Sequence, residues 1–196
     1  MSLFTLANWP MWFVCLAMVL AAVIDGWKFK VPNWLTFPLI LSSWLLGLLH
    51  DCGLFESTGQ GGIGASLAGT ALGFTLLLPV YAVGGMGAGD VKMQMGFGAW
   101  VGAFFGLWPG LATVFWAFCT AAIIGGVIAF FMIILRGQWD RSMANTKEIV
   151  GDWFSSSGVG EIADKAAKRK PRLRLLPYGI PLCLGYLSYL IVLHGF

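Results

Sequence analysis

The chain has 196 residues, of which 58% are hydrophobic and 11% charged, with a net charge of +3 and a mean hydropathy of +0.81. A soluble domain carries about 25% charged residues, so this composition excludes a water-exposed globular protein and indicates a membrane protein. Nucleic-acid binding is not expected, because no basic run is interleaved with aromatic residues on a folded surface. The four cysteines stand singly, without a Cys-x-x-Cys pair, so neither a metal site nor a cofactor is predicted.

Six apolar stretches are candidates for helices that cross the roughly 30 Å hydrocarbon core of a bilayer. In chain order they are Leu3–Ile24, Trp34–Leu49, Ile63–Val83, Met93–Trp108, Leu111–Leu135 and Leu175–Leu193. The first lacks the basic start and the small-residue cleavage site of a secretory signal, so we expect it to be retained. The sequence therefore predicts an all-α integral membrane protein, a bundle of six transmembrane helices in a single domain over residues 1–196.

The basic residues all fall on one side of the membrane if these six helices alternate in direction. Lys28 and Lys30 follow the first helix, Lys92 lies between the third and fourth, and the remainder lie between Arg136 and Arg174. Because basic loops mark the cytoplasmic side, we expect both chain ends outside the cytoplasm. The predicted location is a membrane that the chain crosses several times, with the basic loops on its cytoplasmic side.

The segment 137–171 is the one long polar stretch and is predicted to be a cytoplasmic loop between the fifth and sixth helices. Its basic cluster from Lys165 to Arg172 is typical of a topology anchor that touches anionic lipid headgroups. A lid or a substrate-docking element is the alternative interpretation, and the sequence leaves both open.

Small residues recur every fourth position in the third and fourth predicted helices. They are Gly61, Ala65, Gly69 and Gly73 in the first set and Gly98, Gly102, Gly106 and Gly110 in the second. Such faces let helix backbones approach closely in lipid, where no hydrophobic effect drives association. We expect them to pack within the chain rather than between two chains, and the sequence leaves the oligomeric state open.

Two acidic residues have unusual positions. Asp25 ends the first predicted helix, where the negative end of the helix dipole disfavours an anion by up to about 1 kcal/mol. Asp90 opens the fourth helix after the glycine-rich run 84–89. With the orientation above, both carboxylates lie at the cytoplasmic boundary and therefore at the same membrane depth.

Each carboxylate also has a local structural explanation. Asp90 could cap its helix by accepting from backbone N–H groups two or three residues on, and Asp25 could pair with Lys28 among the lipid headgroups. If the two carboxylates lie close together in a partly dehydrated site, they share a proton. One can then activate a water while the other polarises a carbonyl, which is the chemistry of peptide hydrolysis by an aspartic dyad. Gly87 and Gly89 would let an extended substrate backbone approach Asp90.

Three segments resemble the motifs of type IV prepilin peptidases. Residues 25–33, an aspartate followed eight positions later by the asparagine of a Pro-Asn pair, resemble the first active-site motif of that family. Residues 87–92, Gly-Ala-Gly-Asp-Val-Lys, resemble its GxGD motif. Residues 176–181, Leu-Pro-Tyr-Gly-Ile-Pro, resemble the start of its last helix. The resemblance covers nearly the whole chain.

The resemblance implies a membrane aspartic endopeptidase that removes the short basic leader of prepilins or pseudopilins at the cytoplasmic face, commonly after a glycine. It implies no cofactor, and its expected partners are the prepilin substrate and membrane lipid. It assigns Asp25 and Asp90 as the catalytic pair. The supporting motif residues are Gly87, Gly89, Lys92, Pro32 and Asn33.

Two features qualify the resemblance. Pro32 and Asn33 have a local explanation as a break followed by an N-cap for the second helix. The long members of the family carry an N-terminal extension with two Cys-x-x-Cys pairs and also methylate the new N-terminus. This chain begins at the first helix without such pairs, so we expect the short Tad/Flp-type form without methylation.

Two other functions are compatible with the same residues. A proton- or ion-coupled transporter also places carboxylates on glycine-broken helices, although residues 1–98 and 99–196 show no inverted repeat that can be aligned. A non-catalytic assembly subunit of a pilus or secretion machine would keep the fold without needing both carboxylates.

Overall fold

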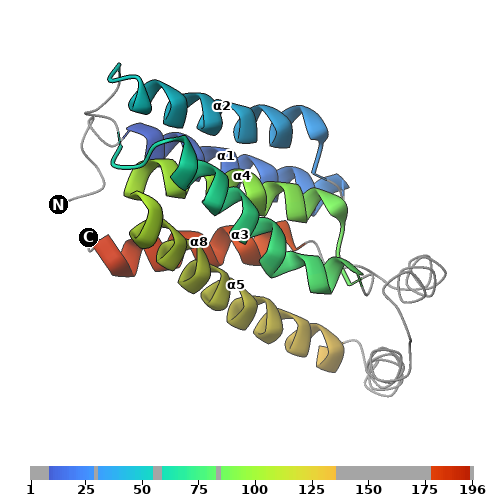
Figure 1. Cartoon of the computed structure of the whole chain (residues 1–196). Coiled ribbons are helices and arrows are strands. Elements are labelled where there is room, and N and C mark those ends of the chain that lie inside the picture. Colours follow the sequence, from blue (N-terminus) through green and yellow to red (C-terminus); the bar gives the residue numbers. More distant parts are fainter. Residues whose placement is uncertain (1–8, 29–30, 55–58, 83–84, 136–177, 195–196) are drawn as a thin grey trace, which may run out of the picture.

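The computed structural model describes residues 9–28, 31–54, 59–82, 85–135 and 178–194, which form six helices and no strand (Figure 1). The helices are α1 (Trp9–Lys28), α2 (Asn33–Asp51), α3 (Ile63–Ala82), α4 (Ala88–Phe105), α5 (Leu107–Leu135) and α8 (Gly179–His194). Among them, α1, α3 and α5 are long and apolar enough to cross a membrane. The predicted all-helical membrane fold is confirmed, and a crossing by all six helices stays a prediction.

Several predicted features lie outside the described residues. They are the loop 137–171 with its basic cluster, residues 3–8 of the first predicted helix, Lys30, Val83 and residues 175–177. Within the described residues, each predicted stretch overlaps a helix.

The helix boundaries differ from the predicted ones, because apolar runs mark where a helix meets lipid rather than where its backbone ends. α1 continues to Lys28, so Asp25 lies inside its last turn and not at its end. α4 begins at Ala88, five residues before the apolar run, which places Asp90 in its first turn. Trp108, predicted to close the fourth helix, belongs to α5.

A single glycine separates α4 from α5. Gly106 has a φ of +83°, in the left-handed region that a residue with a Cβ rarely adopts, and it turns the chain between the two helices. The predicted packing face of the fourth helix is therefore interrupted at its third glycine. The fourth, Gly110, lies on α5, where it faces the backbone of Gly102.

α3 and α4 make the closest backbone contact in the described part of the chain. A Cβ added at Gly69 would overlap the carbonyl oxygen of Gly98, and one added at Gly98 would overlap that of Gly69. One turn further along, Gly102 meets the carbonyl of Ala65 in the same way, and Gly61 meets that of Gly102. The prediction that the two small-residue faces pack within the chain is confirmed.

We expect Gly69→Ala to destabilise the bundle, because the new methyl group must force α3 and α4 apart. Gly64→Ala is the matched control on the same helix, since a Cβ at Gly64 meets nothing within 4 Å. Both changes replace glycine by alanine on the same helix, and only Gly69→Ala overpacks the contact with α4, which costs about 1–3 kcal/mol. Thermal unfolding in detergent, followed by circular dichroism, measures it. Equal midpoints for the two variants would contradict this packing.

α4 is the central helix of the bundle. It contacts α1, α2, α3, α5 and α8, and most of its residues are buried. α8 lies between α1 and α5 and contacts both (Figure 1). Because α4 is shielded by its neighbours, it can carry polar residues that a lipid-facing helix would not. Asp90 therefore enters the bundle at the end where α1 finishes and α2, α4 and α8 begin.

Candidate active site

Asp25 and Asp90 meet at this end of the bundle. Their side chains are only 3% and 6% exposed, although they come from different helices, α1 and α4, which are in contact. The two carboxylates lie close enough for their charges to interact. A buried carboxylate is costly unless it is hydrogen-bonded or protonated, so the surroundings of each carboxylate decide what it can do.

Asp25 is held by the start of the last helix. The backbone N–H of Gly179, the first residue of α8, donates to Asp25 Oδ2 at 2.9 Å. The first N–H groups of a helix have no partner within it and carry partial positive charge, so they favour an anion. This contact offsets the unfavourable position of Asp25 at the C-terminal end of α1. Asp25 is not paired with Lys28, whose side chain is exposed.

Only glycine fits at position 179. A Cβ added there would lie 2.9 Å from both Cβ and Oδ2 of Asp25. Gly179 was not among the predicted site residues, although the segment 176–181 that contains it resembles a family motif. That resemblance was the one signal in the sequence, and it named no partner for Gly179.

Asp90 is held by the residue that precedes its own helix. The N–H of Gly87 donates to Asp90 Oδ2 at 3.2 Å, so the side chain reaches back instead of accepting from residues further on. Asp90 therefore accepts from the residue before its helix and not, as predicted, from residues two or three positions further on. This bond uses only one of its two carboxylate oxygens. Asp90 Oδ1 is buried and has no hydrogen-bond partner among the described residues. An unsatisfied buried acceptor costs about 1–3 kcal/mol, so capping alone does not account for this side chain.

The two glycines of the GxGD motif have different surroundings. A Cβ at Gly89 would come within 3.0 Å of the backbone N and O of Val31, so the space there is taken by the chain itself and not left for a substrate. A Cβ at Gly87 would meet Asp90 Oδ2 at 3.4 Å, an ordinary contact. The expected room for a substrate backbone therefore applies to Gly87 rather than to Gly89.

Lys92 and Asn33 join the two motifs. Lys92 Nζ donates to Asn33 Oδ1 at 2.9 Å and lies 4.7 Å from the centre of the Phe37 ring. The prediction that Asn33 caps the second helix is wrong: Pro32 occupies the cap position, and no side chain caps α2. Pro32 has an extended backbone, in keeping with its predicted role as a break between helices. The bond to Lys92 ties the start of α2 to the first turns of α4.

The third motif contributes a further side chain. Tyr178 precedes α8, is partly buried, and lies within electrostatic range of Asp90. Residues 25–28 with 31–33, residues 87–92 and residues 178–181, which are far apart in the sequence, therefore converge on one end of the bundle. Among the described residues there is no group of three or more His, Cys, Asp or Glu side chains that could hold a metal ion.

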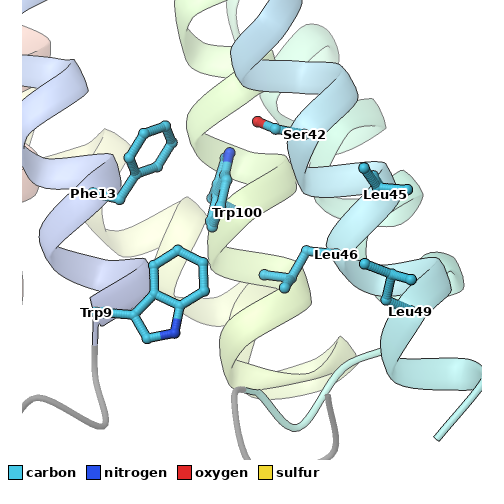
Figure 2. Close-up of a pocket in the computed structure, with 7 residues that line it drawn as sticks. All are labelled: Trp9, Phe13, Ser42, Leu45, Leu46, Leu49 and Trp100. Carbon is cyan, nitrogen blue, oxygen red and sulfur yellow. The ribbon is translucent and has the colours of Figure 1, made fainter. Parts of the chain in front are cut away.

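An apolar groove lies toward the other end of the bundle (Figure 2). It has a volume of about 300 Å³ and is lined mainly by Trp9 and Phe13 of α1, Leu45 and Leu49 of α2, and Trp100 of α4. The indole N–H of Trp100 is already used, since it donates to the carbonyl of Leu39 at 2.8 Å. With no charged side chain in its lining, the groove offers no group for acid–base chemistry.

The fold and the site together define a helical membrane protein with two buried, interacting carboxylates at one end of its bundle. The sequence model of the Type IV leader peptidase family matches residues 12–130, more than half of the chain, and the chain belongs to that family. The matched range contains both Asp25 and Asp90. No curated protein and no solved structure matches the chain.

Membership of this family confirms the resemblance drawn from the motifs. The family is membrane-bound and made up of peptidases, so the chain is a leader-peptidase type of hydrolase. Family membership favours this class over the transporter and over the non-catalytic assembly subunit.

Proposed function

We propose that the protein removes the basic leader peptide of type IV prepilins or pseudopilins, with Asp25 and Asp90 as its catalytic dyad. The observation that carries the proposal is that these two carboxylates, from separate motifs, are buried at the same end of the bundle within electrostatic range of each other, and that a glycine N–H donates to each. Membership of the Type IV leader peptidase family supports the same reaction class.

The dyad works by keeping its two carboxyl groups in different protonation states. Two buried carboxylates within electrostatic range of each other cannot both ionise easily, so the pair holds one proton at working pH. The ionised group removes a proton from a water as the water oxygen bonds to the scissile carbonyl carbon. The protonated group donates a hydrogen bond to the carbonyl oxygen. When the C–N bond breaks, the leaving nitrogen takes up a proton from the dyad, which restores the starting state.

We place this chemistry at the cytoplasmic face of the bacterial inner membrane, in one domain with six crossings and both ends outside. Lys28 and Lys92 lie at the same end of the bundle as the two carboxylates, which supports this orientation. Pro32, Asn33, Gly87, Gly89 and Lys92 then position the pair. The segment 137–171 serves on the same side, either as a lipid-bound anchor or as an element over the substrate. Methylation of the new N-terminus is not part of the proposed function.

The test is cleavage of candidate prepilins by the purified protein reconstituted in vesicles of known orientation. Mass spectrometry of the product should show a new N-terminus directly after a glycine, between the basic leader and the hydrophobic segment. Cleavage should require that the leader be on the face that carries Lys28 and Lys92. Uncut substrate in both orientations would refute the proposed activity, whereas cleavage from the opposite face alone would refute the orientation.

A further inference from the structure

A second buried polar side chain follows Asp90 on α4. Gln94 is 0% exposed and lies four residues after Asp90, hence on the same face of the helix one turn further into the bundle. Its Nε2 donates to the Tyr186 hydroxyl of α8 at 2.8 Å. The Tyr186 hydroxyl in turn donates to the carbonyl of Val114 on α5 at 3.3 Å. These bonds link three helices through a polar chain inside an apolar core.

This chain of donors determines which way the Gln94 amide points. Since the Tyr186 hydroxyl gives its single hydrogen to Val114, it must accept from Gln94, and only Nε2 can donate. Gln94 Oε1 is then directed elsewhere, and it is buried without a partner among the described residues. If the amide were flipped, Nε2 would be the buried atom without a hydrogen-bond partner. The Tyr186 hydroxyl would then donate to Oε1 of Gln94 and lose its bond to the carbonyl of Val114.

Asp90 Oδ1, like Gln94 Oε1, lacks a hydrogen-bond donor among the described residues. Both are buried acceptors without a donor among the described residues, and their side chains are neighbours on one helix face, with Cβ atoms about 5–6 Å apart in this spacing. With Asp90 ionised, a group with two hydrogens to donate serves both acceptors at once, and a water molecule is the smallest such group. A carboxylate oxygen accepts more than one donor, so such a water does not compete with the proton of the dyad.

We propose that a buried water-binding site lies between Asp90 and Gln94, and that Gln94 is the positioning residue that holds the water against the carboxylate. The further step, that this water is the one consumed in hydrolysis, rests on the function proposed above. The bond to Tyr186 does not by itself explain a glutamine here, because the Tyr186 hydroxyl already has an acceptor in Val114.

Hydroxyl-radical labelling by X-ray radiolysis tests the water site without any substrate. Radicals formed from a bound water label the side chains around it even when bulk solvent has no access. Tyr186 and Phe97 are both 0% exposed, and their ring centres are 3.4 Å apart beside Gln94. We expect label on at least one of them in the wild-type protein. Met18, equally buried on α1, should stay unlabelled and serves as the internal control.

The matched variant is Gln94→Leu, which removes both the acceptor and the donor of the side chain without adding a readily oxidised sulfur. It should lose the label on Tyr186 and Phe97, and it should lower kcat for leader cleavage while KM is unchanged. No label on either residue in the wild-type protein would overturn the water site, even if the enzyme is fully active. Label lost with kcat intact would overturn the positioning role. Failure of the proposed function is distinct from both results. In that case the wild-type protein is labelled on Tyr186 or Phe97 but leaves the prepilin uncut.

Discussion

Asp25→Asn and Asp90→Asn are each expected to abolish leader cleavage while the protein still folds and inserts. Asparagine has the size of aspartate and keeps an oxygen that can accept from Gly179 or Gly87, so the local packing is preserved. It cannot take up or share a proton, and general acid–base catalysis alone is worth about 10²–10⁴-fold in rate. Mass spectrometry of the prepilin after incubation with each purified variant measures the loss.

Asp51→Asn provides the matched control for these substitutions. Asp51 ends α2 at the opposite end of the bundle, and its Oδ2 also accepts from a backbone N–H, that of Ile63, at 2.9 Å. The same chemical change there should leave cleavage intact. Wild-type rates from either dyad variant would refute the proposed mechanism, and loss of activity in Asp51→Asn would mean that disturbed folding accounts for the effect.

Gly179→Ala should lower kcat by about 10–100-fold, because misplacing a reacting group by about 1 Å can cost about 10²-fold in rate. The added methyl carbon would lie 2.9 Å from Asp25 Oδ2, so the carboxylate must move away from the N–H that holds it. Initial rates of peptide cleavage at saturating substrate measure the change, and circular dichroism checks that helix content is retained.

Gly126→Ala is the comparison for Gly179→Ala. Gly126 also lies on a helix, α5, and a Cβ at this position meets nothing within 4 Å. It should therefore keep the wild-type rate. If the two variants cleave equally fast, then Gly179 does not position Asp25 for the reaction.

The parts of the fold that depend on local pattern were predictable from the sequence. Apolar runs located every helix in the described part of the chain. The small residues at every fourth position, among them Gly69 and Gly98, identified the faces of α3 and α4 that meet. Both signals repeat with the geometry of a helix and need no knowledge of what lies opposite. Gly106 marks the limit of such prediction. From the sequence pattern alone, a glycine that turns the chain cannot be distinguished from one that packs against a neighbouring helix, and only its φ of +83° distinguishes the two.

The partners of the site residues were not predictable in this way. The motifs indicated that Asp25, Asp90, Lys92 and Asn33 belong to one site, but a hydrogen bond such as that from Lys92 to Asn33 joins residues 59 positions apart. No periodicity connects such residues, since their contact depends on how whole helices pack. Gln94 was overlooked for a related reason: a single polar residue in an apolar helix gains meaning only when its neighbours are known to lack a donor for it.

The bond between Asp25 and Gly179 spans 154 positions, from the first described helix to the last. During synthesis, Asp25 leaves the ribosome long before the residue that will hold it. A nascent chain that does not yet contain α8 lacks this N–H donor, so the hydrogen bond that holds the Asp25 carboxylate forms only after α8 has been synthesised. The order of the helices thereby makes the setting of Asp25 depend on a segment synthesised much later than α1.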